Sequence, residues 1–220
     1  MHHLLPVLAL LLITGCDLND IEVPEEDGLL AIGDSMFDWH RGDGSIPEVV
    51  ADATGLELFD ASVGGAMLTG GFESIPAQRV DGGFDWLLMD GGGNDLNDRC
   101  GCGDCGAVMD ELLTADGSAG VIANVVEEVA AQGIKVLFMG YPELSEGAEF
   151  GFDRCGDELI ELNARLTALN AREDQLWFVS AADVVGADDL HLFDSDRVHP
   201  SPEGCRVMGE YVAETISANR

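Results

Sequence analysis

Five short runs of apolar residues recur along the chain, each four to six residues long. Runs of this length, rich in branched and bulky side chains, are typical of buried β-strands. We expect strands at residues 29–32, 56–61, 86–89, 135–140 and 176–180. The runs at residues 29–32 and 86–89 are continuously apolar rather than alternating, as in a sheet that is covered on both faces.

Helical patterns lie between the apolar runs. Ser45 and Glu48 have the spacing of a capping box, Pro47 suits a first helical turn, and Gly55 should end that helix. Further helices are predicted near residues 108–113, 119–132, 158–172 and 202–217. Strands that alternate with helices predict a parallel sheet between two helical layers, in one α/β domain over residues 28–220.

The chain is strongly acidic. Its 220 residues include 42 Asp and Glu against 10 Lys and Arg, for a formal net charge of −32, and Lys135 is the only lysine. This charge argues against nucleic acid or an anionic membrane surface as a partner. It suits either a protein kept soluble in high salt or an acidic secreted protein, and the composition does not separate the two.

The first residues have the pattern of an export signal. Residues 4–13 form an apolar run too short to span a bilayer, and Ile13-Thr14-Gly15-Cys16 resembles a bacterial lipobox. Only His2 and His3 precede the apolar run, where signal peptides usually carry basic residues. We expect a signal peptide at residues 1–15 and an acidic tether at 16–27. Cys16 would be lipidated on the periplasmic side of a bacterial membrane; the alternative is an ordinary secreted protein.

The sequence Ile32-Gly33-Asp34-Ser35 ends the first predicted strand. A serine there lies at the carboxyl edge of the sheet, where open α/β folds bind their ligands. Ser35 is therefore a candidate nucleophile, whereas the alternative is that Asp34 and Ser35 only cap the next helix.

Other polar groups are expected at the same edge. Acyl transfer through serine needs a base, a group that orients the base, and donors for the oxyanion. His199 can be the base and Asp196 its partner, and the donors can be the Gly65 N–H, the Asn94 amide and the Ser35 N–H. His191 competes as the base, although no carboxylate is spaced as well to orient it.

Four blocks carry a resemblance to a known family. They are Ile32-Gly33-Asp34-Ser35, Asp60-Ala61-Ser62-Val63-Gly64-Gly65, Gly92-Gly93-Asn94-Asp95 and Asp196-Arg197-Val198-His199-Pro200. In order and spacing they resemble the SGNH (or GDSL) hydrolases, except that Asp60 stands where the family often has Asn. The resemblance implies nucleophile Ser35, triad partners His199 and Asp196, and oxyanion donors Ser35, Gly65 and Asn94. It also implies a three-layer, flavodoxin-like α/β/α sandwich with about five parallel strands.

Six cysteines are present. With Cys16 lipidated, an odd number remains: Cys100, Cys102, Cys105, Cys155 and Cys205. In an exported protein we expect disulfides, one within the cluster at residues 100–105 and one from it to Cys155, with a thiol left over. A zinc site on the cluster is the alternative. The polar residues 96–106 around the cluster are expected to form a loop.

These features predict an exported serine esterase that needs no metal or cofactor and acts on a small-molecule, lipid or polysaccharide ester, as a monomer. An apolar acyl pocket could be lined by Met36, Phe37, Trp39, Leu192 and Phe193. The alternatives are an acetylesterase on envelope or extracellular polysaccharide, and a non-catalytic carbohydrate-binding lipoprotein. A Ca²⁺ site at Asp95, Asn97, Asp98 and Asp104 is disfavoured because the spacing matches no EF-hand loop.

Overall fold

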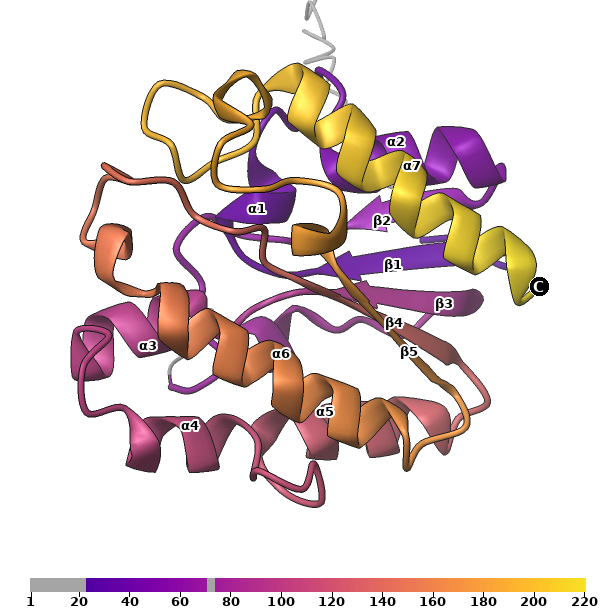
Figure 1. Ribbon diagram of the computed structural model, residues 1–220. Coiled ribbons are helices and arrows are strands. Elements are labelled where there is room, and N and C mark those ends of the chain that lie inside the picture. Colours follow the sequence, from indigo (N-terminus) through magenta and orange to yellow (C-terminus); the bar gives the residue numbers. More distant parts are fainter. Residues whose placement is uncertain (1–22, 71–73) are drawn as a thin grey trace, which may run out of the picture.

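Five parallel strands form the central sheet of the computed structural model, which describes residues 23–70 and 74–220 (Figure 1). Their order across the sheet is β2-β1-β3-β4-β5, as expected for a flavodoxin-like sheet. The bounds are β1 Gly28–Ile32, β2 Glu57–Asp60, β3 Phe84–Met89, β4 Lys135–Gly140 and β5 Leu176–Ser180. The connection from β1 leads to β2 on one side of it, whereas β3, β4 and β5 follow on the other side, so the strand order reverses between β1 and β3. Ligands in these folds bind at such a switch point.

Burial follows the sheet order. Every residue of β1 is buried, and in β3 only Asp85 is exposed. The edge strand β2 has no fully buried residue, because one side of it has no neighbouring strand. The continuous apolar pattern of β1 and β3 is thus explained by their central position between two helical layers.

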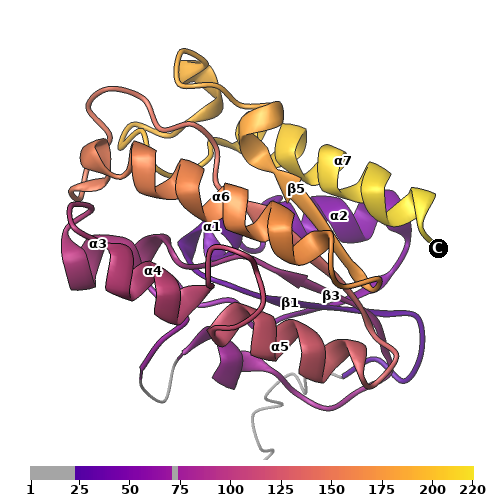
Figure 2. The ribbon, with the colours of Figure 1, turned by 60° about the horizontal axis from the view of Figure 1, so that its bottom comes forward.

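Within the part of the chain that the structure describes, seven α-helices surround the sheet: α1 Ser35–Asp38, α2 Ile46–Thr54, α3 Gly93–Cys100, α4 Gly106–Leu112, α5 Val121–Ala130, α6 Gly156–Asn170 and α7 Pro202–Ala218. Helices α2 and α7 pack together on one face, while α5 and α6 cover the other (Figures 1 and 2). The predicted capping box of α2 is complete, and Gly55 ends this helix with a φ of 72°. The three-layer α/β/α sandwich is therefore confirmed.

The prediction of a loop at residues 96–106 is wrong for the first half of that segment, because α3 continues to Cys100. The segment looked like a loop because it is polar, but its polar groups have distant partners. Asp95 is buried and accepts hydrogen bonds from the backbone N–H groups of Leu68 and Thr69 at 2.8 and 3.0 Å. Leu96 packs in the core. Tertiary contacts, rather than local propensity, form this helix.

The described residues contain two disulfides, Cys100–Cys105 and Cys102–Cys155, and Cys205 is a buried free thiol. The three clustered cysteines are thus bonded as expected rather than available as zinc ligands. The second bridge closes a loop of 53 residues, which stabilises the fold by about 4 kcal/mol if loop-closure entropy dominates.

The proposed signal peptide, Cys16 and most of the tether lie outside the described residues. In residues 23–70 and 74–220, no helix is both long and apolar enough to cross a membrane.

Candidate active site

The turn after β1 presents Ser35 at the carboxyl edge of the sheet, beside the loops that follow β4 and β5 (Figure 1). The Asp34 side chain accepts a hydrogen bond from the Met36 N–H at 2.9 Å and so caps α1, and Ser35 is the first residue of that helix. Gly33 is required here because a Cβ atom would lie 2.0 Å from Asp90 Oδ1. The capping interpretation thus holds for Asp34, whereas the half-buried Ser35 hydroxyl is directed elsewhere.

Ser35 Oγ lies 2.8 Å from His199 Nε2, and His199 Nδ1 lies 2.7 Å from Asp196 Oδ2. With a proton on Nδ1, donated to Asp196, the imidazole presents Nε2 as an acceptor for the Ser35 proton. The structure brings these three side chains together in the geometry that nucleophilic acyl transfer needs.

Asp196 is held as a carboxylate. Partial burial favours its neutral form, but hydrogen bonds from the His199 side chain and from the backbone N–H groups of His199 and Val198 outweigh that effect. The pKa of Asp196 is therefore lowered. A charged Asp196 can fix the tautomer of His199 and stabilise the imidazolium that forms during the reaction.

A tight turn brings Asp196 and His199 to the same side of their loop. Asp194 N–H donates to the His199 carbonyl at 2.8 Å, Phe193 and Pro200 form an isolated bridge, and Arg197 has a φ of 59°. His191, the competing base, is exposed, and its carbonyl accepts a hydrogen bond from Ser201. It takes no part in the arrangement around Ser35.

The expected oxyanion donors meet at the same turn. The backbone N–H groups of Ser35 and Gly65 have no acceptor among the described residues, as a site for a transient oxyanion requires. The Asn94 amide donates to the Ala66 carbonyl at 2.9 Å and to Asp34 Oδ2 at 3.3 Å. These bonds hold Asn94, in the first turn of α3, beside both the Ser35 turn and the Gly65 loop.

A buried polar network below Ser35 was not anticipated from the sequence. Tyr141, directly after β4, donates its hydroxyl proton to Asp34 Oδ2 at 2.5 Å and accepts from the Gly93 N–H at 3.0 Å. Asp90, directly after β3, accepts from the Asp34 N–H at 2.8 Å. In the sequence, the position of Asp90 directly after a strand was the one feature that could have indicated its place in this network. Tyr141 lies 107 residues from Asp34, and no sequence pattern indicated their contact.

The Asp90 carboxyl group is fully buried, and its Oδ2 has no partner among the described residues. Burial, reinforced by the nearby Asp34 charge, raises the pKa of Asp90 well above its ordinary value. The folded protein therefore keeps a proton on Asp90 over a pH range in which the unfolded chain has lost it.

We expect the free energy of unfolding of the wild type to fall, relative to that of Asp90→Asn, as the pH rises above the ordinary Asp value of 3.8. The stabilising contribution is full below that pH and is lost as the pH passes the raised folded-state value. Urea unfolding of both proteins at several pH values measures this difference. A difference that is constant with pH would mean that folding leaves the pKa of Asp90 unchanged, and a difference that favours the wild type more as the pH rises would mean that folding lowers it.

Most of the side chains expected to line an acyl pocket are core residues. Met36, Phe37, Leu192 and Phe193 are all less than 7% exposed and belong to the hydrophobic core. For these four residues the expectation of an acyl pocket is wrong, because α1 and the loop before α7 turn them inward. Trp39 is the exception, since it lies against His199.

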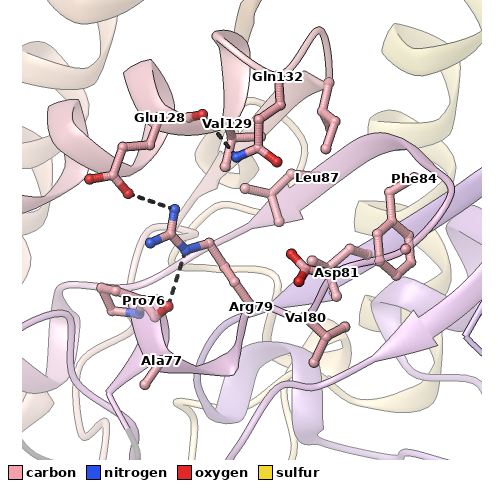
Figure 3. A pocket seen from close by; sticks show the side chains of 13 residues that line it. Pro76, Ala77, Arg79, Val80, Asp81, Phe84, Leu87, Glu128, Val129 and Gln132 are labelled. Carbon is pink, nitrogen blue, oxygen red and sulfur yellow. Dashed lines mark hydrogen bonds and ion pairs between the residues drawn. The ribbon is translucent and has the colours of Figure 1, made fainter.

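A cavity of about 500 Å³ lies away from Ser35, at the amino-terminal edge of the sheet (Figure 3). Phe84 at the start of β3 and Ile134 just before β4 belong to its lining. Arg79 pairs with Glu128 of α5 across it at 2.9 Å and also donates to the Pro76 carbonyl (Figure 3). Its lining includes no serine, cysteine or histidine, and the candidate nucleophile and base both lie at the Ser35 edge of the sheet.

The model of the GDSL-like Lipase/Acylhydrolase family matches residues 31–207, a range that contains Ser35, Gly65, Asn94, Asp196 and His199. No curated protein matches the chain.

Solved structures with a similar fold include three bacterial proteins. Est24, a carbohydrate acetylesterase from Sinorhizobium meliloti, is 16% identical, with a TM-score of 0.63 over 89% of this chain and 100% of its own. The inhibitor-bound aryl esterase of M. smegmatis is 17% identical, with a TM-score of 0.60 over 87% and 99%. A GDSL-like lipase from Bacteroides thetaiotaomicron is 20% identical, with a TM-score of 0.60 over 88% and 89%. At these identities the similarity establishes the fold.

Proposed function

The chain belongs to the GDSL-like lipase/acylhydrolase family, a family of hydrolases, and on that premise we propose that it is an exported serine esterase whose acyl-enzyme forms on Ser35. One observation carries the proposal: a continuous hydrogen-bond path runs from Ser35 Oγ through the His199 ring to Asp196, at 2.8 and 2.7 Å. A protein that only binds carbohydrate has no need of such a path.

In the first half-reaction, Ser35 Oγ attacks the ester carbonyl carbon and its proton passes to His199 Nε2. The carbonyl oxygen becomes an oxyanion that accepts hydrogen bonds from the free N–H groups of Ser35 and Gly65. The Asn94 amide becomes a third donor when one of its hydrogens leaves Asp34 Oδ2, the longer of its two bonds at 3.3 Å, for the oxyanion. When the intermediate collapses, the bond to the alcohol oxygen breaks, and the imidazolium returns its proton to that oxygen. The alcohol leaves, and the acyl group stays on Ser35.

In the second half-reaction, a water molecule attacks the acyl carbon and gives a proton to His199 Nε2. Collapse of the second tetrahedral intermediate expels Ser35 Oγ, which takes the proton back. The carboxylic acid is released and the enzyme is restored. Asp196 keeps its hydrogen bond to Nδ1 throughout and stabilises the imidazolium in both halves.

We propose that the site takes short acyl groups rather than long ones. Four of the five residues that could have lined an apolar acyl pocket are packed in the core. The net charge of −32 also disfavours anionic substrates, because an unpaired negative group would approach an acidic surface. We therefore propose uncharged esters of short acids, a class that includes acetylated sugars.

Turnover of p-nitrophenyl acetate, butyrate, octanoate and palmitate tests this proposal. We expect kcat/KM to be highest for acetate or butyrate and to fall with longer chains. Release of acetate from an acetylated polysaccharide would narrow the natural substrate. A maximum at octanoate or palmitate would contradict the short-chain assignment, and no turnover of any ester would contradict the esterase itself.

We also propose that the mature chain begins at a lipidated Cys16 and is exported. Two disulfides support export, because such bonds persist in oxidising compartments. Mass spectrometry of the protein expressed in bacteria with its own leader should show a chain that starts at Cys16 and carries a lipid. Four thiols should become alkylatable only after reduction. Cleavage at another position, without added lipid mass, would indicate ordinary secretion.

A further inference from the structure

The imidazole of His199 is covered on one face by the indole of Trp39. The ring centroids are 3.9 Å apart and the planes differ by 8°, which is a parallel stack. Trp39 follows α1 directly, four residues after Ser35, and its backbone N–H donates to the Ser35 carbonyl at 3.0 Å. The element that presents the nucleophile therefore also presents a flat surface to the base.

The indole is itself fixed from the loop that carries His199. Trp39 Nε1–H donates to Asp194 Oδ2 at 2.6 Å, and His40 Nε2 lies 3.3 Å from the same oxygen. The Asp194 backbone N–H donates to the His199 carbonyl at 2.8 Å. These contacts connect Trp39 to Asp194, Asp194 to His199 and His199 back to Trp39. They join the turn after β1 to the loop before α7.

This arrangement has two physical consequences. The hydrogen bonds at Nδ1 and Nε2 both lie near the plane of the His199 ring, so they restrict the tilt of that plane only weakly. A parallel indole at 3.9 Å restricts the tilt further. In addition, an aromatic face attracts a cation, so the indole favours the imidazolium over the neutral imidazole.

We propose that Trp39, anchored by Asp194, is a positioning residue that fixes the plane of His199 and stabilises its protonated form during acyl transfer. The inference rests on the proposed function of His199 as the base. It assigns to Trp39 a role distinct from that of a wall of the substrate pocket. Substitution of a residue that lines the substrate pocket would change KM, to an extent that depends on the length of the acyl chain. Substitution of a positioning residue lowers kcat for every ester.

Three variants separate the contributions. Trp39→Leu keeps an apolar cover over the imidazole but removes the aromatic face, Trp39→Phe keeps a face but loses the N–H, and Asp194→Asn weakens the anchor. Other titratable groups that interact with His199 or its partners are Asp196 on its loop, Asp34 in the turn after β1, and His40. All three are unchanged in these variants.

For Trp39→Leu we expect kcat to fall about 10-fold for acetate and butyrate esters alike, with KM little changed. The acid limb of the kcat profile should move down by about half a pH unit to one unit, because protonated His199 loses the stacked indole. Phe150, whose ring is tilted against His199 at 6.2 Å, is unchanged in these variants. Trp39→Phe should recover most of both effects, and Asp194→Asn should lie between Trp39→Phe and Trp39→Leu. A change confined to KM, or an acid limb that stays in place, would overturn the proposal.

An NMR titration of the His199 ring keeps this test separate from the proposed function. The signal is assigned by its absence in His199→Gln, and its midpoint is compared between the wild type and Trp39→Leu. A downward shift supports the stacking role even if no ester tried is a substrate, and an unchanged midpoint overturns it. Near-UV circular dichroism and the unfolding midpoint show whether each variant is folded. If Trp39→Leu is not folded, Trp39→Met, which also removes the aromatic face, takes its place in the comparison.

Discussion

Replacing Ser35 by alanine is expected to lower kcat/KM by about 10⁴-fold or more for every ester that the wild type hydrolyses. The substitution removes the one oxygen that lies 2.8 Å from His199 Nε2, and no acyl-enzyme can then form. The residual rate would come from water held near the oxyanion donors. Steady-state kinetics with p-nitrophenyl acetate measures the loss.

The fold should tolerate this change. The Ser35 side chain is half-buried and its hydroxyl bonds to His199, so its removal opens no cavity in the core. Ser145→Ala is a matched control, because the Ser145 hydroxyl is buried and has no partner among the described residues. That variant should retain full activity. A Ser35→Ala protein with more than about 1% of wild-type activity would show that another group carries the acyl chemistry.

The second large effect is expected for Asp196→Asn, with a loss of about 10³- to 10⁴-fold in kcat/KM. An amide at this position can donate to Nδ1 and thereby favour the tautomer with its proton on Nε2. That tautomer cannot accept the Ser35 proton. Asp196 is held by the backbone N–H groups of Val198 and His199 at 2.9 and 3.0 Å, so the loop keeps one acceptor oxygen in the variant.

Asp194→Asn is the matched control for this prediction. Asp194 lies on the same loop but reaches the His199 ring only through Trp39. Its loss should cost no more than about 10-fold, because the tautomer set by Asp196 is kept. Equal losses in the two variants would contradict the assignment of Asp196 as the orienting carboxylate.

The parts of this site that the sequence predicted are those fixed by the topology of a parallel sheet. Ser35 follows β1, Gly65 follows β2 and Asn94 follows β3, so apolar runs and the turns after them were enough to bring these residues to one edge. Asp196 and His199 are three residues apart, and their pairing depends on one local turn.

Other features depend on contacts between distant positions. The bond from Tyr141 to Asp34 and the stack of Trp39 on His199 join residues more than 100 apart, for which no local pattern exists. Helix α3 looked like a loop because its polar residues gave no sign of their buried partners, Asp95 with Thr69 among them. Met36 and Phe37 looked like pocket residues because apolar character alone does not distinguish a pocket from a core.

The central claim is that Ser35 is an activated nucleophile, and a fluorophosphonate probe tests it most directly because labelling does not depend on the identity of the natural substrate. Peptide mass mapping should find one adduct per folded chain, on Ser35. Labelling should be absent in Ser35→Ala and after denaturation, and strongly slowed in Asp196→Asn. No adduct on the folded wild type, or an adduct on a different serine, would contradict the account.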